Sequence, residues 1–424
     1  MRLTAGSHHG RTGHRVASAI AILGLAVAAA ACGSPSSSTS GATGATIKLG
    51  LVSSITGPLA STFGPDVEAG FNARVSREND AGGVNGRKLE VTVADDTSTA
   101  PGAVTAVQNL MRQDVFAVGS WSALMFNAYK PLNQAGIPLV GGAFGAPQFG
   151  DPSLTNQFSV FGPLDPAFPV YDSYGKLLKS LGVTKLASLG YGTVPSSKNS
   201  ATAFAASAKA AGIAICYENY GLPSGGVDFT PVALAIKNAG CDGIYASMVS
   251  SSQLALAQSV RDSGVTLKGM VSTQGYEQRT LDDPRVREAA QGITFVNPMS
   301  LVAEPNAGMK TMLGDLQKYA NSTGIPSFGE FGGWLTADAL IAGLEAAGAN
   351  PTRESFIDGL RKVSDYDAGG VLAGPTDFTV GQIGKGDSIL SGSRCWFALT
   401  LVGDSFTPVN GTTPFCGDPV AGAK

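Results

Sequence analysis

The hydrophobic pattern that begins at residue 47 alternates between strand and helix. Residues 47–51 place Ile and Leu at every second position, which is typical of a strand. Val67, Phe71 and Val75 recur every four residues and predict an apolar stripe on a helix. Residues 89–93 repeat the strand pattern. A strand, a helix and a strand in this order predict a βαβ unit with parallel strands and a right-handed connection.

The same alternation continues along the chain and restarts once. A Gly-, Pro- and Asn-rich stretch at residues 145–165 separates a first series from a second one that begins at residue 185. Further strands are expected at residues 115–119, 137–140, 185–189, 213–217, 243–247, 269–271 and 293–296, with two β segments at 396–402 and 406–409. Further helices are expected at residues 104–111, 122–135, 201–211, 229–236, 253–263, 309–321, 333–347 and 353–363.

Two such series imply two α/β lobes, each with an open, mostly parallel sheet. Ligands on these sheets gather beyond the carboxyl ends of the strands. In the first βαβ unit, that edge comprises residues 53–63 and the pair Asp95 and Asp96. We assign residues 47–163 and 295–385 to the first lobe, and residues 164–294 and 386–424 to the second.

The amino terminus has the pattern of an export signal. Three arginines precede residues 16–31, which carry no charge and end in three alanines before Cys32. This run is too short for a spanning helix, which needs about 20 apolar residues, so residues 1–31 are interpreted as a signal peptide. The Ala-Ala-Ala-Cys junction resembles a bacterial lipobox, which implies a lipid on Cys32; a free secreted protein is the alternative. Residues 32–46 are then a Ser/Gly-rich flexible tether.

Composition and charge indicate a globular chain and argue against one class of binding partner. The apolar fraction of 43% with 14% charged residues is enough for well-packed cores. Without the three arginines of the signal, 26 of the 29 basic residues remain against 32 acidic ones. A mildly acidic chain without a basic run argues against a nucleic-acid partner.

Histidine is confined to the expected signal peptide, at His8, His9 and His14. Its absence from the rest of the chain excludes Ser-His-Asp and Cys-His catalysis and the common His-ligated zinc sites. We therefore expect no metal and no cofactor. A hydrolase that uses two carboxylates stays formally open, with Asp95, Asp96, Asp282, Asp283 and Glu330 available.

The remaining cysteines form an even set in a chain that is expected to be exported. Disulfides persist in oxidising compartments, so pairing is expected for Cys216, Cys241, Cys395 and Cys416. Proximity favours Cys216 with Cys241 and Cys395 with Cys416, which is one of three connectivities.

Several fragments along the chain together carry a resemblance to a known family. They are Ile-Thr-Gly-Pro-Leu-Ala at residues 55–60, residues 79–90, Asp95-Asp96, Val-Gly-Ser at 118–120, residues 374–378 and residues 395–409. In this order they resemble the solute receptors of the branched-chain amino acid type, the type I periplasmic binding proteins, over nearly all of the chain after residue 46. The resemblance implies two lobes joined by three crossovers, which close on a small ligand by a hinge motion and deliver it to the membrane permease of an ABC importer.

The resemblance also places the amino-acid clamp of that family on this chain, and most of the clamp is absent. Ala123 stands at the position of the family's serine, and Gly145 stands at that of its threonine. Thr273 stands near the position where the family has the acid that holds the ammonium group. Phe63 stands at one tyrosine position, and Val249 or Ser250 stands at another. Because a buried ammonium group needs a compensating carboxylate, the ligand is not expected to be an α-amino acid.

The residues themselves suggest an apolar or aromatic lining, with core packing as the alternative for each aromatic. Trp121 is the first choice because it lies at the carboxyl end of a strand. Ser122 is either a polar contact or only a helix cap, and the helix predicted to start there could present backbone N–H groups to a carboxylate. The other candidate contacts are Phe63, Phe144, Phe161, Thr273 and Gln274, with Asp165 and Tyr191 from the second lobe.

The sequence therefore predicts a non-enzymatic solute receptor of an ABC importer, lipid-anchored on the outer face of the bacterial cytoplasmic membrane and monomeric. Its expected ligand is a small apolar or aromatic acid or amide. The alternatives are a branched-chain amino acid receptor, a ligand sensor that signals to a membrane partner, and an exported carboxylate-dependent hydrolase.

Overall fold

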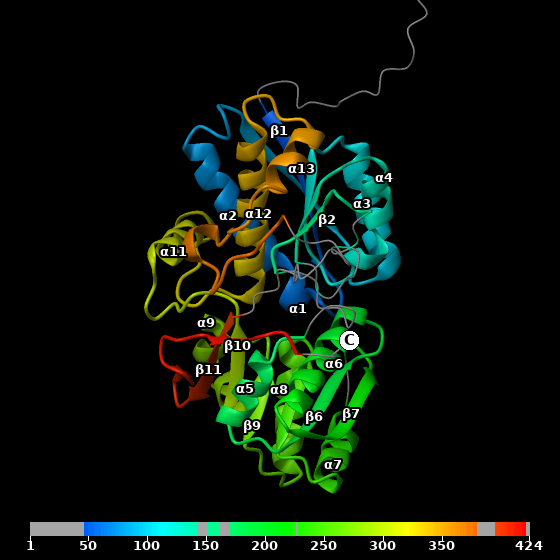
Figure 1. Cartoon of the computed structure of the whole chain (residues 1–424), viewed down its shortest axis with the longest axis vertical. Helices are drawn as coiled ribbons and strands as arrows, with labels where there is room; N and C mark the ends of the chain where they lie inside the picture. Colours follow the sequence, from blue (N-terminus) through cyan, green and yellow to red (C-terminus); the bar gives the residue numbers. More distant parts are fainter. Residues whose placement is uncertain are drawn as a thin grey trace, which may run out of the picture. The chain divides into compact units, whose positions relative to one another are not determined.

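The computed structural model describes residues 46–142, 144, 149, 151, 153–161, 170–225, 228–379 and 395–420. These residues build two separate β-sheets with helices packed on them (Figure 1), which confirms the predicted α/β class with mostly parallel strands. The signal peptide, Cys32 and the tether up to residue 45 lie outside the described residues, as do Gly145 and Asp165.

The first sheet contains only parallel pairs, in the order β2-β1-β3-β4-β5. Its helices come both from the adjacent sequence and from residues 307–360. The strands are β1 (Thr46–Ser53), β2 (Lys88–Asp95), β3 (Ala117–Trp121), β4 (Leu139–Gly141) and β5 (Gln157–Ser159). The helices are α1 (Ala60–Phe63), α2 (Pro65–Asp80), α3 (Ala100–Arg112), α4 (Tyr129–Gln134), α11 (Ala307–Ala320), α12 (Phe328–Ala347) and α13 (Arg353–Leu360).

Helices α2 and α12 lie against each other closely because glycines face the neighbouring backbone. A Cβ atom on Gly333 of α12 would be 2.0 Å from the carbonyl oxygen of Val67, and one on Gly70 of α2 would be 2.0 Å from that of Glu330. Neither position has room for a side chain. Helix α12 begins with a capping box between Ser327 and Glu330, which fixes its first turn.

The second sheet has the order β12-β11-β10-β9-β8-β6-β7, and β13 pairs with β11. Pairs from β7 to β10 are parallel, whereas β11 and β12 are antiparallel. The strands are β6 (Lys185–Tyr191), β7 (Ala214–Leu222), β8 (Gly243–Ser247), β9 (Gly269–Ser272), β10 (Ile293–Asn297), β11 (Cys395–Val402), β12 (Ser405–Pro408) and β13 (Phe415–Cys416). The helices are α5 (Ser173–Ser180), α6 (Pro195–Ala210), α7 (Thr230–Asn238), α8 (Ser250–Asp262), α9 (Gln278–Asp282) and α10 (Pro284–Ala289).

Successive side chains of β6 and β8 alternate between two hydrophobic clusters. Leu186 and Tyr245 belong to one hydrophobic cluster with Phe204 of α6, whereas Ala187 and Ile244 belong to the other cluster. This alternation is the period of two that strands impose on their two faces.

Two details differ from the expectation. The helix predicted at residues 122–135 does not begin at Ser122: a short 3₁₀ turn, Met125–Asn127, comes first, and α4 begins only at Tyr129. The return to the first lobe was predicted at residues 294/295, but β10 pairs within the second sheet as far as Asn297. The other lobe boundaries stay predictions.

The cysteines pair in the connectivity that proximity favours. Cys216 of β7 is bonded to Cys241, and Cys395 of β11 is bonded to Cys416 of β13. The second disulfide therefore holds β13 on β11, beside the paired residues Trp396 and Phe415. Across the described ranges, no helix has the length and apolarity that a membrane crossing requires, and no cluster of potential metal ligands occurs.

Candidate functional site

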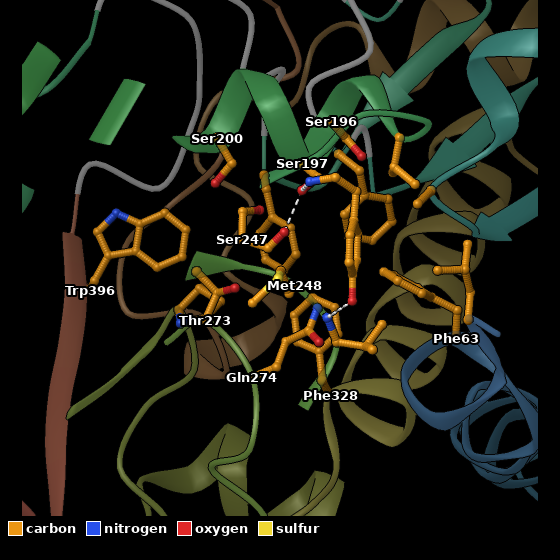
Figure 2. A pocket seen from close by; sticks show the side chains of 18 of the residues that line it. Phe63, Ser196, Ser197, Ser200, Ser247, Met248, Thr273, Gln274, Phe328 and Trp396 are labelled. Carbon is orange, nitrogen blue, oxygen red and sulfur yellow. Dashed lines mark hydrogen bonds between the residues drawn. The ribbon is translucent and has the colours of Figure 1, made fainter. Parts of the chain in front are cut away.

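A cavity is lined by side chains that come from elements of both sheets (Figure 2). Its walls differ in chemistry, because aromatic residues dominate one wall and hydroxyl groups the other. The first wall consists of Leu59, Phe63, Ala123, Phe144, Phe161 and Phe328. The second wall consists of Tyr174, Tyr191, Val194, Ser196, Ser197, Ser200, Ser247, Met248, Val249, Thr273, Gln274, Pro298 and Trp396.

The aromatic wall is held together by edge-to-face contacts. The Phe63 ring lies 5.3 Å from that of Phe144 and 6.1 Å from that of Phe328 between centroids, in both cases T-shaped. Such pairs each add about 0.5–1.5 kcal/mol beyond their buried area. The wall is therefore a packed and pre-shaped surface for an apolar ligand body.

Trp121 lies behind this wall and not in it. It is fully buried, and its ring packs at 4.9 Å from Phe144, 5.3 Å from Phe161 and 5.2 Å from Phe328. It is not among the residues that line the cavity. The sequence-based choice of Trp121 as the first ligand contact therefore has no support in this geometry, which gives the indole a packing role.

Ser122 is also directed away from the cavity. Its hydroxyl donates to the carboxylate of Asp96 and accepts from the backbone N–H of Leu124 at 3.1 Å. It is not a cap of a long helix, and α4, with only six residues, begins farther along the chain. The predicted helix terminus that would hold a ligand carboxylate at Ser122 is therefore wrong.

The pair Asp95 and Asp96 holds turns together. Asp96 is fully buried and accepts from the hydroxyl of Ser54 at 3.0 Å as well as from Ser122. Burial raises the pKa of the Asp96 carboxyl, against the opposing effect of these hydrogen bonds. Asp95 accepts from the hydroxyl of Thr56 at 2.6 Å. Neither carboxylate lines the cavity, so their geometry gives the hydrolase alternative no support.

The hydroxyl wall is ordered by α6 and the ends of β6 and β8. The hydroxyl of Ser197 donates to the carbonyl of Ser247 and accepts from the backbone N–H of Tyr191 at 2.8 Å. The hydroxyl of Tyr191 donates to Ser252 at 2.9 Å and accepts from the N–H of Val249 at 3.3 Å. These bonds fix the Tyr191 ring as a rigid part of the wall.

A second group of hydroxyls gathers around Tyr245. The hydroxyl groups of Ser200 and Tyr245 are 2.6 Å apart, and Ser247 and Thr273 line the same cavity as Ser200. Burial raises the pKa of Tyr245 to about 12, against the opposing effect of hydrogen bonding, so the phenol is neutral at physiological pH.

Polar contacts beside the cavity connect elements of the two sheets. The hydroxyl of Thr62 in α1 donates to the side-chain oxygen of Gln274 at 3.0 Å, and Gln274 follows β9. Arg279 of α9 forms an ion pair with Asp66 of α2 at 2.7 Å. Both contacts join helices beside the first sheet to residues beside the second.

The lining is uncharged as far as it is described. None of the lining residues named above is Asp, Glu, Lys, Arg or His. A buried charge on a ligand would therefore have no described ionic partner here.

The sequence identified part of this lining. The residues that it named and that line the cavity are Phe63, Ala123, Phe144, Phe161, Tyr191, Thr273 and Gln274. Of the two residues offered for the second tyrosine position, Val249 lines the cavity and Ser250 is the first residue of α8. The serines of α6 were missed, although they follow the carboxyl end of β6 directly. Phe328 and Trp396 were also missed, and no local pattern marks them, because they reach the cavity from distant parts of the chain.

Comparisons with known proteins converge on one family. A sequence model described as a periplasmic binding protein matches residues 46–388. The Leu/Ile/Val-binding protein homolog 3 of Brucella melitensis is 24% identical over 317 residues, which cover 72% of this chain and 80% of that protein.

Solved structures share the fold at low sequence identity. One is a fatty acid ABC transporter substrate-binding protein from Thermomonospora curvata, with a TM-score of 0.72, 18% identity, and coverage of 90% of this chain and 94% of that chain. Another is an ABC transporter solute-binding protein from R. palustris in complex with benzoate, with a TM-score of 0.70, 16% identity, and coverage of 89% and 98%.

Proposed function

We propose that this chain, which belongs to the periplasmic binding protein family, captures a small apolar or aromatic acid or amide for an ABC importer. The family binds small molecules and works with ABC permeases. The ligand would occupy the cavity between the aromatic and hydroxyl walls, and the chain itself would carry out no chemistry.

The observation that carries the choice of ligand is the uncharged lining of the cavity. An α-amino acid brings an ammonium group besides its carboxylate, and burying that cation without a carboxylate partner costs several kcal/mol or more. The carboxylate of a simple acid can instead accept hydrogen bonds from the hydroxyls of the second wall. Thr273 lines this cavity, and the resemblance aligns it near the family's acid that holds the ammonium group. The aromatic wall instead offers Phe63, Phe144 and Phe328 to an apolar body.

Relatives make both ligand types worth comparing. Of the similar structures, one carries benzoate and one is described as a fatty acid ABC transporter substrate-binding protein. Another is a branched-chain amino acid binding protein in complex with isoleucine, and the curated relative is described as a Leu/Ile/Val-binding homolog. The described lining favours the former chemistry. A branched-chain amino acid thus serves as the comparison ligand in each test.

The proposal includes the location of the chain. The signal pattern and the Cys32 junction support export and a lipid anchor on the outer face of the cytoplasmic membrane. There the chain would act as a monomer and present its loaded form to permease subunits. Incorporation of labelled palmitate that disappears in Cys32→Ala would identify the anchor.

A thermal-shift panel tests the ligand class. We expect benzoate, benzamide and their alkyl analogues to raise the melting temperature, because a ligand that binds only the folded state stabilises it by mass action. Leucine and valine should have little effect. Phe328→Ala should reduce the shift, since Phe328 lines the cavity, whereas Phe406→Ala, a partly buried phenylalanine outside the cavity, should not. Strong shifts with leucine alone would reject the ligand class while leaving the receptor function standing.

A further inference from the structure

The cavity extends beyond the aromatic wall, along one edge of the second sheet. In the second sheet, β6, β8, β9, β10 and β11 are successive neighbours. Each of these strands contributes one residue to the lining at a single edge of the sheet. The parallel strands β6, β8, β9 and β10 contribute residues at or just after their carboxyl ends, and the antiparallel β11 contributes a residue near its start. In this order the residues are Tyr191, Ser247, Thr273, Pro298 and Trp396. Four spacings between neighbouring strands amount to about 19 Å. The lining therefore follows the sheet edge as an elongated site.

Figure 2 shows the order of the groups along this site. Phe63 and Phe328 lie at one side and Trp396 at the other, with Ser200, Ser247 and Thr273 between them. We call the part bounded by Tyr174, Ser200, Ser247, Thr273 and Trp396 the inner compartment. Its far end is aromatic, because the rings of Tyr174 and Trp396 lie 5.7 Å apart.

The inner compartment is built rigidly from the second sheet and its helices. Tyr174 of α5 stacks on Phe204 at 4.2 Å, and Phe204 stacks on Tyr245 at 3.7 Å. Tyr245 in turn holds Ser200 through the 2.6 Å contact between their hydroxyls. These contacts make the compartment a continuation of a packed core.

The chemistry of the compartment selects an uncharged polar group. Hydroxyls both donate and accept hydrogen bonds, so Ser200, Ser247 and Thr273 can pair with a carbonyl oxygen, a hydroxyl or an amide N–H. No described residue of the compartment carries a charge. A carboxylate would lose its hydration there without gaining an ionic partner.

We propose that the inner compartment binds the uncharged polar end of an elongated ligand, an amide, ester or alcohol, whose apolar body extends to the aromatic wall. This inference rests on the proposed function and narrows its ligand class from acid or amide to uncharged, extended molecules. It also assigns Ser200, Thr273 and Trp396 as specificity-determining residues.

A series of unbranched primary amides from butanamide to dodecanamide tests the length of the site. Comparison with the matching carboxylates tests whether the site selects an uncharged end group. We titrate the full chain with this series and with the matching carboxylates, by calorimetry and by tryptophan fluorescence. Affinity should rise about fourfold per methylene until the site is full, the factor that about 0.8 kcal/mol per buried CH₂ gives. Each long amide should bind about tenfold tighter than its carboxylate. The fluorescence change should be lost in Trp396→Phe.

Variants on α6 locate the compartment. Ser200→Phe fills it and should weaken binding of the long amides by about tenfold or more. Lys198→Phe adds the same ring at an exposed position of the same helix and should leave binding unchanged. Circular dichroism verifies the fold of each variant. If Ser200→Phe does not fold, the proposal is tested by the fluorescence change that depends on Trp396 and by the comparison of amides with carboxylates.

The outcomes separate this inference from the proposed function. The inference would be overturned, and the proposed function would stand, if benzamide or benzoate binds but the affinity for amides does not depend on chain length. In that case the fluorescence of Trp396 would not change on binding, and Ser200→Phe would not weaken binding. Long carboxylates that bind tighter than the amides would also overturn it. If neither the aromatic compounds nor the alkyl series binds, both proposals fail.

Discussion

Trp121→Ala should lower the free energy of unfolding by about 3–5 kcal/mol, the usual range when a large buried aromatic is truncated. Trp121 is fully buried and packs against Phe144, Phe161 and Phe328. Its removal would leave a void behind the aromatic wall and loosen it. Guanidinium denaturation followed by circular dichroism measures the loss.

Gly332 provides an internal control for this role. A Cβ atom on Gly332 would lie 1.8 Å from the indole ring of Trp121, so Gly332→Ala should cost about 1–3 kcal/mol through overpacking. In a Trp121→Ala background, the methyl group would enter the void and the cost should largely vanish, which a double-mutant cycle reports as coupling. If Trp121→Ala left the stability unchanged but abolished ligand binding, the packing role would be contradicted and Trp121 would be a direct ligand contact.

Removing either disulfide should cost about 3 kcal/mol, because each closes a loop of similar length in the unfolded chain. The bonded residues are separated by 25 positions for Cys216–Cys241 and by 21 for Cys395–Cys416. We expect similar losses of unfolding free energy when each pair is replaced by alanines. Denaturant titration of the two double variants measures them.

The two disulfides should differ in their effect on ligand binding. Cys395–Cys416 holds β13 beside Trp396, which ends the inner compartment, whereas Cys216 and Cys241 do not line the cavity. Loss of the first pair should therefore weaken dodecanamide binding, and loss of the second should not. Equal binding in both variants would contradict a role of β13 in shaping the compartment.

The strand pattern predicted the architecture because strands and helices leave local periodicities. The edge rule for parallel sheets then included Phe63, and the family resemblance added Thr273; both line the cavity. The same rule misplaced Trp121. Position along a strand does not say which way a terminal side chain points, and here the indole packs towards α12 at Gly332.

Residues that act through distant contacts left no local signal. Ser122 looked like a helix cap, but its hydroxyl is bonded to Asp96, which lies far away in the sequence. Phe328 and Trp396 join the cavity only because α12 packs on the first sheet and β11 adds to the second. Predicting them requires the tertiary packing, which no single stretch encodes.

The most direct test of the central claim is a parallel calorimetric titration of the full chain with benzamide and with leucine. The uncharged lining leads us to expect that benzamide binds at least about tenfold tighter than leucine. The binding heat for benzamide should fall with temperature, since burial of apolar surface gives a negative heat-capacity change. Tighter binding of leucine would contradict the account, because it would require a carboxylate partner that the described lining does not contain.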